Sequence, residues 1–305
     1  MRILIAYDGS RYADAAIDDL RRAGLPRQCE ATVVSVAHQG WPEAKKKGPR
    51  GEFDNPWTAT LKEAEAMAEA ARQRIQSAFP GWVVSSEPLW GEPAKLLLKT
   101  IHVWKPDLVI VGSHGRSVPA RLILGSVSTE LLHHASCSVR VVRKPPKTDA
   151  PVRILIATDG SNPAQACIDA VAQRSWPEGS EARVVAVMQT LVPVATTVPA
   201  LEGHTFASEE AYRVIEKADE QQRAQLHQSV EAAAERLQRA GLSVTAVVVD
   251  GDARHEVNAE AERWGADSVF VGARGLGAID RLLLGSVSSA VVAHAPCAVE
   301  VVRHR

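Results

Sequence analysis

Residues 109–115 read Val109-Ile110-Val111-Gly112-Ser113-His114-Gly115, and nine residues later the chain continues Gly125-Ser126-Val127-Ser128. A short β-branched run that ends at glycine predicts a buried parallel strand followed by a tight turn. The Gly-Ser pair precedes a helical pattern, and the first amide groups of a helix have no partner within it. Such an end attracts anions, so the stretch is interpreted as a phosphate cradle. In the alternative reading, the glycines only connect a strand to a helix.

The same pattern occurs a second time along the chain. Residues 269–275 read Val269-Phe270-Val271-Gly272-Ala273-Arg274-Gly275, and nine residues separate them from Gly285-Ser286-Val287-Ser288. The start of the chain, Arg2–Ser10, is repeated almost letter for letter by Arg153–Ser161. Two copies at one spacing favour phosphate binding over a purely connecting role, and they indicate an internal duplication of one domain.

Each half alternates apolar strand patterns with helical patterns. This rhythm predicts βαβ units with right-handed crossovers and a parallel sheet covered by helices on both faces. We expect one domain at residues 1–144 and a second at 151–305, joined by the proline-stiffened linker Lys144–Pro151. The first strand of the chain ends at Asp8 and the fourth at Gly112. If these strands are neighbours, both residues lie in the crevice where such sheets bind ligands.

Composition limits the classes of protein to consider. A chain of 305 residues with 46% hydrophobic content can bury two cores, and its net charge of −1 provides no general attraction to nucleic acid. The chain contains no apolar run of membrane-spanning length, and charges come too early for a signal peptide. The four cysteines form no CxxC pair. We therefore expect reduced, buried thiols, a cytoplasmic protein, and neither a nucleic acid nor a membrane as partner.

Several motifs of well-known enzymes are missing from the sequence. There is no GxxxxGK[ST], no GxGxxG after the first strand and no GxSxG. The ten histidines show no HxxxH or HExxH spacing, so no metal site of that kind is predicted, and His134 and His294 are interpreted as packed structural residues. The cradles offer amides, hydroxyls and at most Arg274. Such a site is expected to bind a nucleotide better than to hydrolyse it.

These residues together resemble the universal stress protein domain, in its ATP-binding branch and tandem arrangement. The Gly-x-x-Gly, nine-residue, Gly-Ser pattern carries the resemblance in both halves, which together span essentially the whole chain. The resemblance implies two doubly wound, five-stranded parallel-sheet domains of the Rossmann-like, adenine nucleotide alpha-hydrolase-like α/β class. It also implies that the domains pair through their fifth strands as an intrachain pseudo-dimer. ATP, with Mg²⁺ bound only through the nucleotide, and a regulatory role in stress are implied as well.

The resemblance further implies an ATP site in each half. Adenine is expected near Asp8 and the backbone of Val36, and the phosphates against the glycine loop and the following helix. The expected first site comprises Ala6, Tyr7, Asp8, Val36, Val111, Gly112, His114, Gly115, Arg116, Gly125, Ser126, Val127 and Ser128. The expected second site comprises Ala157, Thr158, Asp159, Val187, Val271, Gly272, Arg274, Gly275, Gly285, Ser286, Val287 and Ser288. Arg274 is a fixed cation where His114 is largely neutral at pH 7, so unequal affinities are hypothesised.

Some roles stay open between two readings. Asp8 and Asp159 can each accept a hydrogen bond from an exocyclic amine or help hold Mg²⁺ through water, or each can cap the following helix. Ser126 and Ser286 can each cap the helix that follows and also donate to a phosphate oxygen. In the fifth strands, Arg140 and Glu300 are equivalent, so pairing of the two halves would set opposite charges near each other. A further homodimer is also possible.

Two other functions remain as alternatives to an ATP-binding regulatory protein. One is an enzyme, either a slow ATPase or a nucleotide-handling transferase. The other is a nucleotide-free interaction module in which the glycine turns are only architecture.

Overall fold

The computed structural model describes the chain except for residues 39–55, 117–123, 147–150, 190–208, 276–283 and 304–305. The first half runs β1 (Arg2–Ala6), α1 (Arg11–Asp19), the short 3-10 helix η1 (Leu20–Arg22), β2 (Glu30–Ala37), α2 (Pro56–Ala78), β3 (Val83–Trp90), α3 (Pro93–Trp104), β4 (Leu108–Gly112), α4 (Ser126–His134) and β5 (Ser138–Val142). The second half runs β6 (Arg153–Ala157), α5 (Asn162–Ala172), β7 (Glu181–Met188), α6 (Glu209–Arg239), β8 (Ser243–Asp250), α7 (Ala253–Trp264), β9 (Ser268–Gly272), α8 (Ser286–His294) and β10 (Ala298–Val302).

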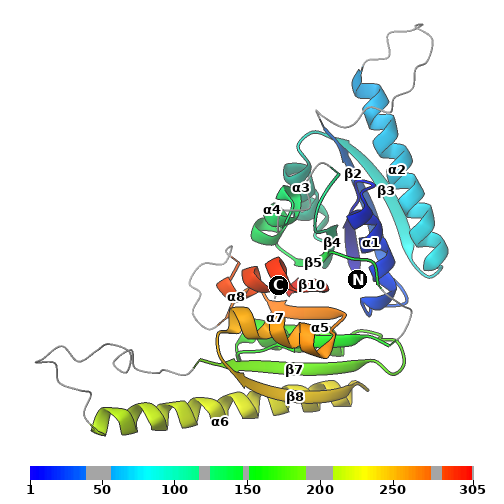
Figure 1. The fold of residues 1–305 in the computed structure, drawn as a ribbon. Coiled ribbons are helices and arrows are strands. Elements are labelled where there is room, and N and C mark those ends of the chain that lie inside the picture. The colour runs from blue at the N-terminus through cyan, green and yellow to red at the C-terminus, as the bar shows by residue number, and fades with distance from the viewer. Residues whose placement is uncertain (39–55, 117–123, 147–150, 190–208, 276–283, 304–305) are drawn as a thin grey trace, which may run out of the picture.

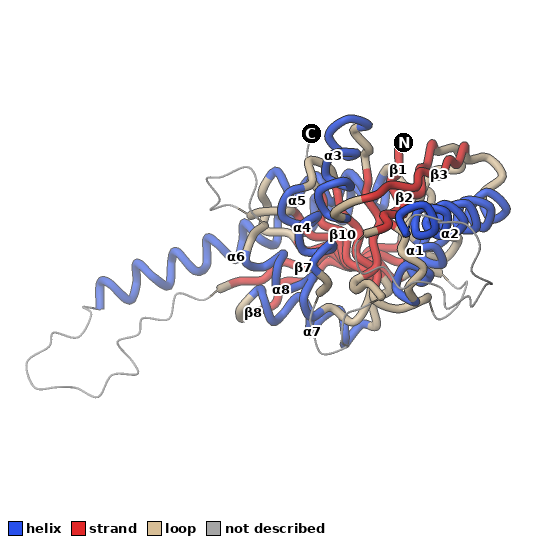
Figure 2. Tube along the Cα trace, turned by 90° about the horizontal axis from the view of Figure 1, so that it is seen from above, coloured by secondary structure: helices blue, strands red, loops and turns tan. Residues whose placement is uncertain are grey.

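The strands form one continuous sheet in the order β3-β2-β1-β4-β5-β10-β9-β6-β7-β8. Pairing is parallel within each half and antiparallel where β5 meets β10. Each half is thus a doubly wound α/β unit of five parallel strands, as the sequence predicts. The predicted pairing of the fifth strands is also confirmed. Figure 1 shows the two units meeting at this seam, and Figure 2 shows strands at the centre with helices around them.

Helices cover both faces of the sheet because alternate residues of the buried strands point to opposite sides. On one face, α1 and α2 pack on Ile3 and Ile5 in the first half, and α5 and α6 pack on Ile154 and Ile156 in the second. On the opposite face, a single apolar cluster runs from Leu97 of α3 to Val291 of α8. The two halves therefore share one core on that face, and the seam is part of it.

The seam contains a buried group of charges. Arg140 of β5 is fully buried and lies opposite Glu300 of β10. Its Nε donates to Asp19 Oδ2 at 2.6 Å, and its Nη1 donates to Ser268 Oγ at 2.9 Å. Burial lowers the pKa of Arg140, but the carboxylates of Asp19 and Glu300 outweigh that effect and hold the pKa above its usual value. Arg140 therefore stays charged, and the predicted opposition of unlike charges is confirmed.

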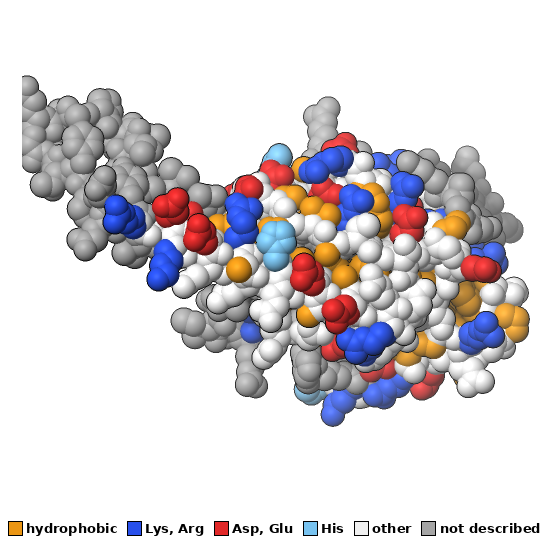
Figure 3. Space-filling model, turned by 90° about the horizontal axis from the view of Figure 1, so that it is seen from below, with side chains coloured by type: hydrophobic (Ala, Val, Ile, Leu, Met, Phe, Trp, Pro, Cys, Tyr) orange, Lys and Arg blue, Asp and Glu red, His pale blue; other side chains and the backbone are white. Residues whose placement is uncertain are grey.

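The charged side chains and the cysteines are arranged as follows. On the face drawn in Figure 3, acidic and basic side chains are interspersed. Cys29, Cys137 and Cys167 are buried free thiols, and Cys297 is partly buried. Burial raises the pKa of Cys297 to about 12, so its thiol stays protonated. Among the described residues, no helix is both long and apolar enough to cross a bilayer.

Candidate functional site

The first and fourth strands of each half are neighbours, which is the condition for the predicted ligand crevice. β1 and β4 are adjacent and parallel, with Ala6 opposite Val111, and β6 and β9 pair in the same way. From β1 the chain winds outward to β2, whereas β4 leads to β5 on the other side. The carboxyl ends of β1 and β4 therefore flank a switch in winding direction, which is where open α/β sheets bind ligands.

The first cradle is held by backbone hydrogen bonds. Gly125 N–H donates to the Ser113 carbonyl at 2.8 Å, which folds the chain back beside the glycine turn. Thr129 N–H then donates to the Gly125 carbonyl at 3.0 Å as the first regular bond of α4. The amides of Ser126, Val127 and Ser128 precede that bond, so they have no partner inside the helix. The positive end of α4 consequently lies beside the glycine loop.

The second cradle repeats this geometry. Gly285 N–H donates to the Ala273 carbonyl at 2.8 Å, and Ser289 N–H donates to the Gly285 carbonyl at 2.9 Å. The amides of Ser286, Val287 and Ser288 are left in the same way at the start of α8. Two segments that share a sequence pattern thus share a hydrogen-bond pattern.

Close packing within the protein leaves little room for a side chain at these glycines. A Cβ added at Gly112 would lie 2.7 Å from the Tyr12 carbonyl carbon, because α1 crosses directly over the end of β4. A Cβ at Gly275 would lie 2.4 Å from Asp159 Oδ2, and one at Gly115 would lie 3.0 Å from Asp8 Oδ2. The structure shows that these glycines let neighbouring segments pack closely. That architectural role is compatible with ligand binding at the same place.

The serines divide into two kinds. Ser126 is exposed and is the first residue of α4, while the cap position belongs to Gly125, which makes no side-chain capping bond. The prediction that Ser126 can cap the helix is wrong by one residue. Ser128 is buried, and its hydroxyl donates to the Gly112 carbonyl at 2.7 Å. Ser286 and Ser288 repeat this division, with Ser288 donating to Gly272. Ser126 can offer a ligand its hydroxyl, whereas Ser128 faces inward.

Asp8 joins the end of the first strand to the first glycine loop, and Asp159 occupies the matching position in the second half. Asp8 Oδ1 accepts from Ser10 N–H at 3.0 Å, and Oδ2 accepts from Arg116 N–H at 3.1 Å. Asp159 accepts from Ser161 N–H at 3.0 Å. The cap of α1 is Ser10, whose Oγ accepts from Ala13 N–H at 3.1 Å. The cap of α5 is likewise Ser161, so the interpretation of Asp8 and Asp159 as helix caps is wrong.

The cap residue Ser10 was missed by sequence reasoning, although the matched Asp-Gly-Ser in both halves carried the signal. Ser10 Oγ also donates to the His114 carbonyl at 3.4 Å, which ties the start of α1 to the cradle loop.

The two cradles differ at the position before their second glycine. His114 is 8% exposed, its Nδ1 lies 3.0 Å from Ser113 Oγ, and its ring lies 4.9 Å from the ring of Tyr12. Arg274, at the matching position, is partly exposed. The first half thus packs an imidazole inward where the second half carries a guanidinium. Arg116 follows the first glycine loop, and its guanidinium lies against Met67 Sδ of α2.

The apolar residues expected in the two ATP sites lie near the C-terminal ends of the first, second and fourth strands of each half. Ala6, Val36, Val111, Ala157 and Val271 are buried, and Val187 is partly buried. Their side chains belong to the same apolar cluster as α4 and α8 or pack against it.

In each half, the residue that follows the first strand donates a backbone hydrogen bond to the second strand. Tyr7 N–H donates to the Val34 carbonyl, and Thr158 N–H donates to the Val185 carbonyl, each at 2.9 Å. The Tyr7 ring packs with the α1–α2 cluster, and its hydroxyl donates to Asp14 Oδ1 at 2.9 Å.

Two further observations concern residues outside the cradles. His134 and His294 are exposed, so the interpretation of both as packed structural residues is wrong; His134 lies 3.5 Å from Glu130 on its own helix. Within the described ranges, no three His, Cys, Asp or Glu side chains come together as a metal-binding group.

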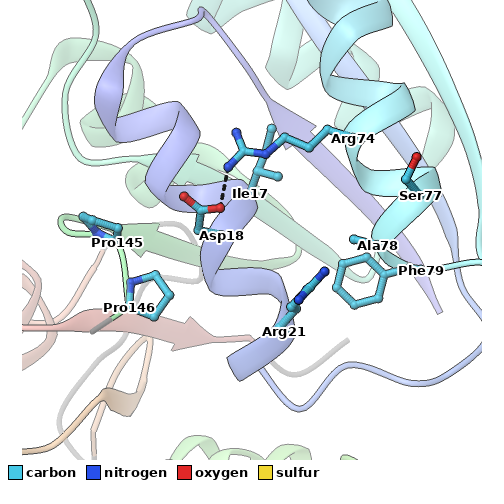
Figure 4. Close-up of a pocket in the computed structure, with 9 residues that line it drawn as sticks. All are labelled: Ile17, Asp18, Arg21, Arg74, Ser77, Ala78, Phe79, Pro145 and Pro146. Atoms are coloured by element: carbon cyan, nitrogen blue, oxygen red, sulfur yellow. Dashed lines mark hydrogen bonds and ion pairs between the residues drawn. The ribbon is translucent and has the colours of Figure 1, made fainter. Parts of the chain in front are cut away.

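A hollow of about 500 Å³ lies at the C-terminal ends of α1 and α2, at the opposite end of α1 from the cradle (Figure 4). Arg74 of α2 forms an ion pair with Asp18 of α1 there. The residues that line it are Ile17, Asp18, Arg21, Arg74, Ser77, Ala78, Phe79, Pro145 and Pro146.

Comparison with known proteins agrees with the duplicated fold. The model of the family described as "Universal stress protein family" matches residues 1–143 and again residues 152–303. The chain belongs to the universal stress protein family. A universal stress protein of Mycobacterium tuberculosis is 30% identical over 300 residues, which cover 95% of this chain and 92% of that protein. One from Mycolicibacterium smegmatis is 28% identical over 99% of this chain and 97% of its own.

Solved structures of the same size share the fold. A universal stress protein from Archaeoglobus fulgidus superposes with a TM-score of 0.62 at 19% identity, covering 99% of this chain and 96% of that one. A Pseudomonas aeruginosa protein described as functionally unknown gives a TM-score of 0.58 at 16% identity, covering 99% and 92%. The tandem arrangement of this universal stress protein therefore recurs in proteins of similar length.

Proposed function

We propose that this universal stress protein binds ATP at both cradles and acts as a regulatory protein through the bound nucleotide. One observation supports this most strongly. In both halves a helix begins with three amide groups that have no partner inside the helix, beside a glycine loop, at the switch point of the sheet. Helix starts of this kind favour phosphate groups through directed N–H donors and the helix dipole.

The residues present fit such a ligand. The phosphates would meet the amides of Ser126–Ser128 in the first half and Ser286–Ser288 in the second, with the exposed hydroxyls of Ser126 and Ser286 as further donors. Gly125 packs closely on the glycine loop, since a Cβ there would lie 3.3 Å from His114 Cα. Adenine would lie toward Asp8 and Val36, and toward Asp159 and Val187. Mg²⁺ would come with the phosphates, which is how this ion is often bound.

The chemistry of the cradle favours binding over hydrolysis. Rapid phosphoryl transfer uses a positioned base or water-orienting group together with cationic clamps. The carboxylate of Asp8 already accepts two backbone amides, so it is engaged in holding the loop. Arg274 is the cation that the second cradle offers, and the first carries the inward-packed His114 in its place. We therefore propose slow turnover at most, with nucleotide occupancy as the signal.

The proposal is tested by mass spectrometry of nucleotide released from the purified, denatured protein, followed by calorimetric titration of the nucleotide-free protein with Mg-ATP. We expect an adenine nucleotide in the first measurement and saturable binding at two sites in the second. ADP formation slower than nucleotide exchange is expected over the same period. Protein that carries no nucleotide and shows no binding at millimolar Mg-ATP would rule the proposal out. Rapid ADP formation that depends on Arg274 would instead favour the enzyme reading.

A further inference from the structure

Two arginines cross the seam in opposite directions. Arg143 directly follows β5, and its Nη2 donates to the carbonyls of Val292 and Ala293 in α8, the latter at 2.7 Å. Arg303 directly follows β10, and its Nη2 donates to the carbonyl of Leu132 in α4. Each half thus supplies a guanidinium to a helix of the other half.

These carbonyls are the ones that a helix leaves without partners at its C-terminus. In α4, Ala135 N–H donates to the Leu131 carbonyl at 2.9 Å. The Leu132 carbonyl is therefore the first one without a partner inside the helix. In α8, Ala295 N–H takes the Val291 carbonyl at 2.9 Å, and Val292 and Ala293 remain. A cation that donates to these oxygens satisfies them and also opposes the negative end of the helix dipole.

Both helices are the cradle helices, and both are short. α4 and α8 have nine residues each, so their two ends lie about 13 Å apart at a rise of 1.5 Å per residue. An anion at one end and a guanidinium at the other both stabilise the same dipole. A helix of this length gains little stability from its own hydrogen bonds, so its position depends on contacts at its ends and its apolar face.

The same arginines are joined to the glycine loops of their own halves. Val142, the residue before Arg143, accepts from Ser113 N–H at 2.8 Å, and Val302, before Arg303, accepts from Ala273 N–H at 3.0 Å. Burial lowers the pKa of both guanidinium groups, so both cations are partly desolvated where they meet the helix ends. Each strand end therefore touches one cradle through its backbone and the other through its arginine.

We propose that Arg143 and Arg303 are positioning residues that act crosswise: each holds the anion-binding helix of the opposite half. The first cradle depends on Arg303, and the second depends on Arg143. This inference rests on the proposed function for its ligand, but the holding of each helix is a property of the ligand-free chain as well. The pairing of the two halves would then help to position both cradle helices, because each helix end is held by an arginine of the other half.

The test uses the full chain with Arg303→Met and Arg143→Met, each the control for the other. Amide hydrogen exchange is measured on the nucleotide-free protein over residues 126–134 and 286–294. We expect Arg303→Met to speed exchange in 126–134 by about fivefold and leave 286–294 within about twofold, with the reverse for Arg143→Met. Arg303→Lys keeps a cation at the helix end and should recover most of the loss.

Ligand binding gives the second readout. With Mg-ATP as the probe, protection of residues 126–128 and 286–288 reports the two cradles separately. Arg303→Met should weaken binding at the first cradle by about fivefold, while binding at the second stays unchanged.

The possible outcomes are distinguishable. Faster exchange in the variant's own half, or equal change in both helices, overturns the inference. If Arg303→Met also speeds amide exchange in β1 and β6, the Arg303→Lys variant is decisive. A smaller increase confined to residues 126–134 supports the inference, and an equal increase in both helices overturns it. A wild-type protein without ATP protection at either cradle defeats the proposed function. The crossed exchange pattern then still shows whether the arginines hold the helices.

Discussion

Arg140 lies directly opposite Glu300 in the antiparallel register of β5 and β10, and the two side chains approach to 3.5 Å between Nη1 and Oε2. Their positions are equivalent in the two halves, so two copies of either half would place like charges at this point. Each member of the pair also has a partner from its own half: Asp19 for Arg140, and Arg174 for Glu300 at 2.9 Å. The seam is therefore built for two different halves.

Removal of Arg140 should destabilise the protein strongly. Arg140→Met leaves Asp19 buried without its partner, and such a change costs about 3–5 kcal/mol of unfolding free energy. Arg239→Met is the control, because Arg239 pairs with Glu235 on the surface and is 72% exposed. The control should change stability by less than about 0.5 kcal/mol. Urea unfolding followed by circular dichroism measures both, and equal midpoints for the two variants would contradict the role given to the seam charges.

The cradle amides can be tested without removing a side chain from the core. Ser126→Pro deletes one N–H at the first helical position, where proline is well tolerated. The preceding Gly125 has φ −75° and ψ 158°, which suits a residue before proline. Affinity for Mg-ATP at the first cradle should fall by about tenfold, since a hydrogen bond to a charged group is lost.

Ser126→Ala is the matched control for this substitution. It removes the hydroxyl and keeps the amide, so its loss should be less than about threefold. Calorimetric titration and thermal melting together separate binding from folding. Equal affinities for the proline variant and the wild-type protein would show that this amide does not meet the phosphates.

The features that occur in both halves of the chain could be predicted from the sequence. Alternating strand and helix patterns predicted the parallel sheets, and the repeat of both strand ends predicted that the first and fourth strands are neighbours. The opposite charges of Arg140 and Glu300 were also visible, because equivalent residues can be compared between the two copies. Each of these inferences depends on local periodicity or on the duplication.

Features decided by one residue of register or by long-range contacts were not predictable in this way. The helix cap falls on Gly125 and not on Ser126, a shift that the Gly-Ser pattern does not reveal. His134 points to solvent because of its place on α4, although its repeat in both halves suggested packing. The reach of Arg143 and Arg303 across the seam depends on how the antiparallel strands are aligned. That alignment joins residues about half the chain apart.

Stability should depend on the ionisation of Tyr7 at alkaline pH. Burial, and then the hydrogen bond to Asp14, raise the pKa of Tyr7 from 10.0 to about 12. The folded pKa is higher than the unfolded one, so the stabilisation is complete below pH 10 and is lost as the pH rises toward 12. Between pH 10 and pH 12, the unfolding free energy of Tyr7→Phe should therefore fall less steeply than that of the wild-type protein.

Phenolate absorbance provides the direct measurement for Tyr7. The chain has three tyrosines, and one should titrate late in the wild-type protein and disappear from the curve of Tyr7→Phe. A titration midpoint near pH 10 for Tyr7 in the folded wild-type protein would contradict the raised pKa.

Gly24 connects the halves at a second place, next to η1. Its φ is +63°, and a Cβ there would lie 2.8 Å from the indole ring of Trp176 in the other half. Gly24→Ala therefore combines backbone strain with a clash against a ring, which is held in turn by its Nε1 donating to the Val171 carbonyl at 2.9 Å.

Gly241 separates these two contributions. Its φ is +90°, and no atom lies within 4 Å of the position of its Cβ, so Gly241→Ala tests strain alone. Gly241→Ala should cost about 1 kcal/mol, and Gly24→Ala about 1–3 kcal/mol more, because overpacking adds to strain. Urea unfolding of the two variants measures the difference directly. Equal losses would mean that Trp176 moves aside at little cost, and the contact between Gly24 and the ring would then contribute nothing to holding the halves together.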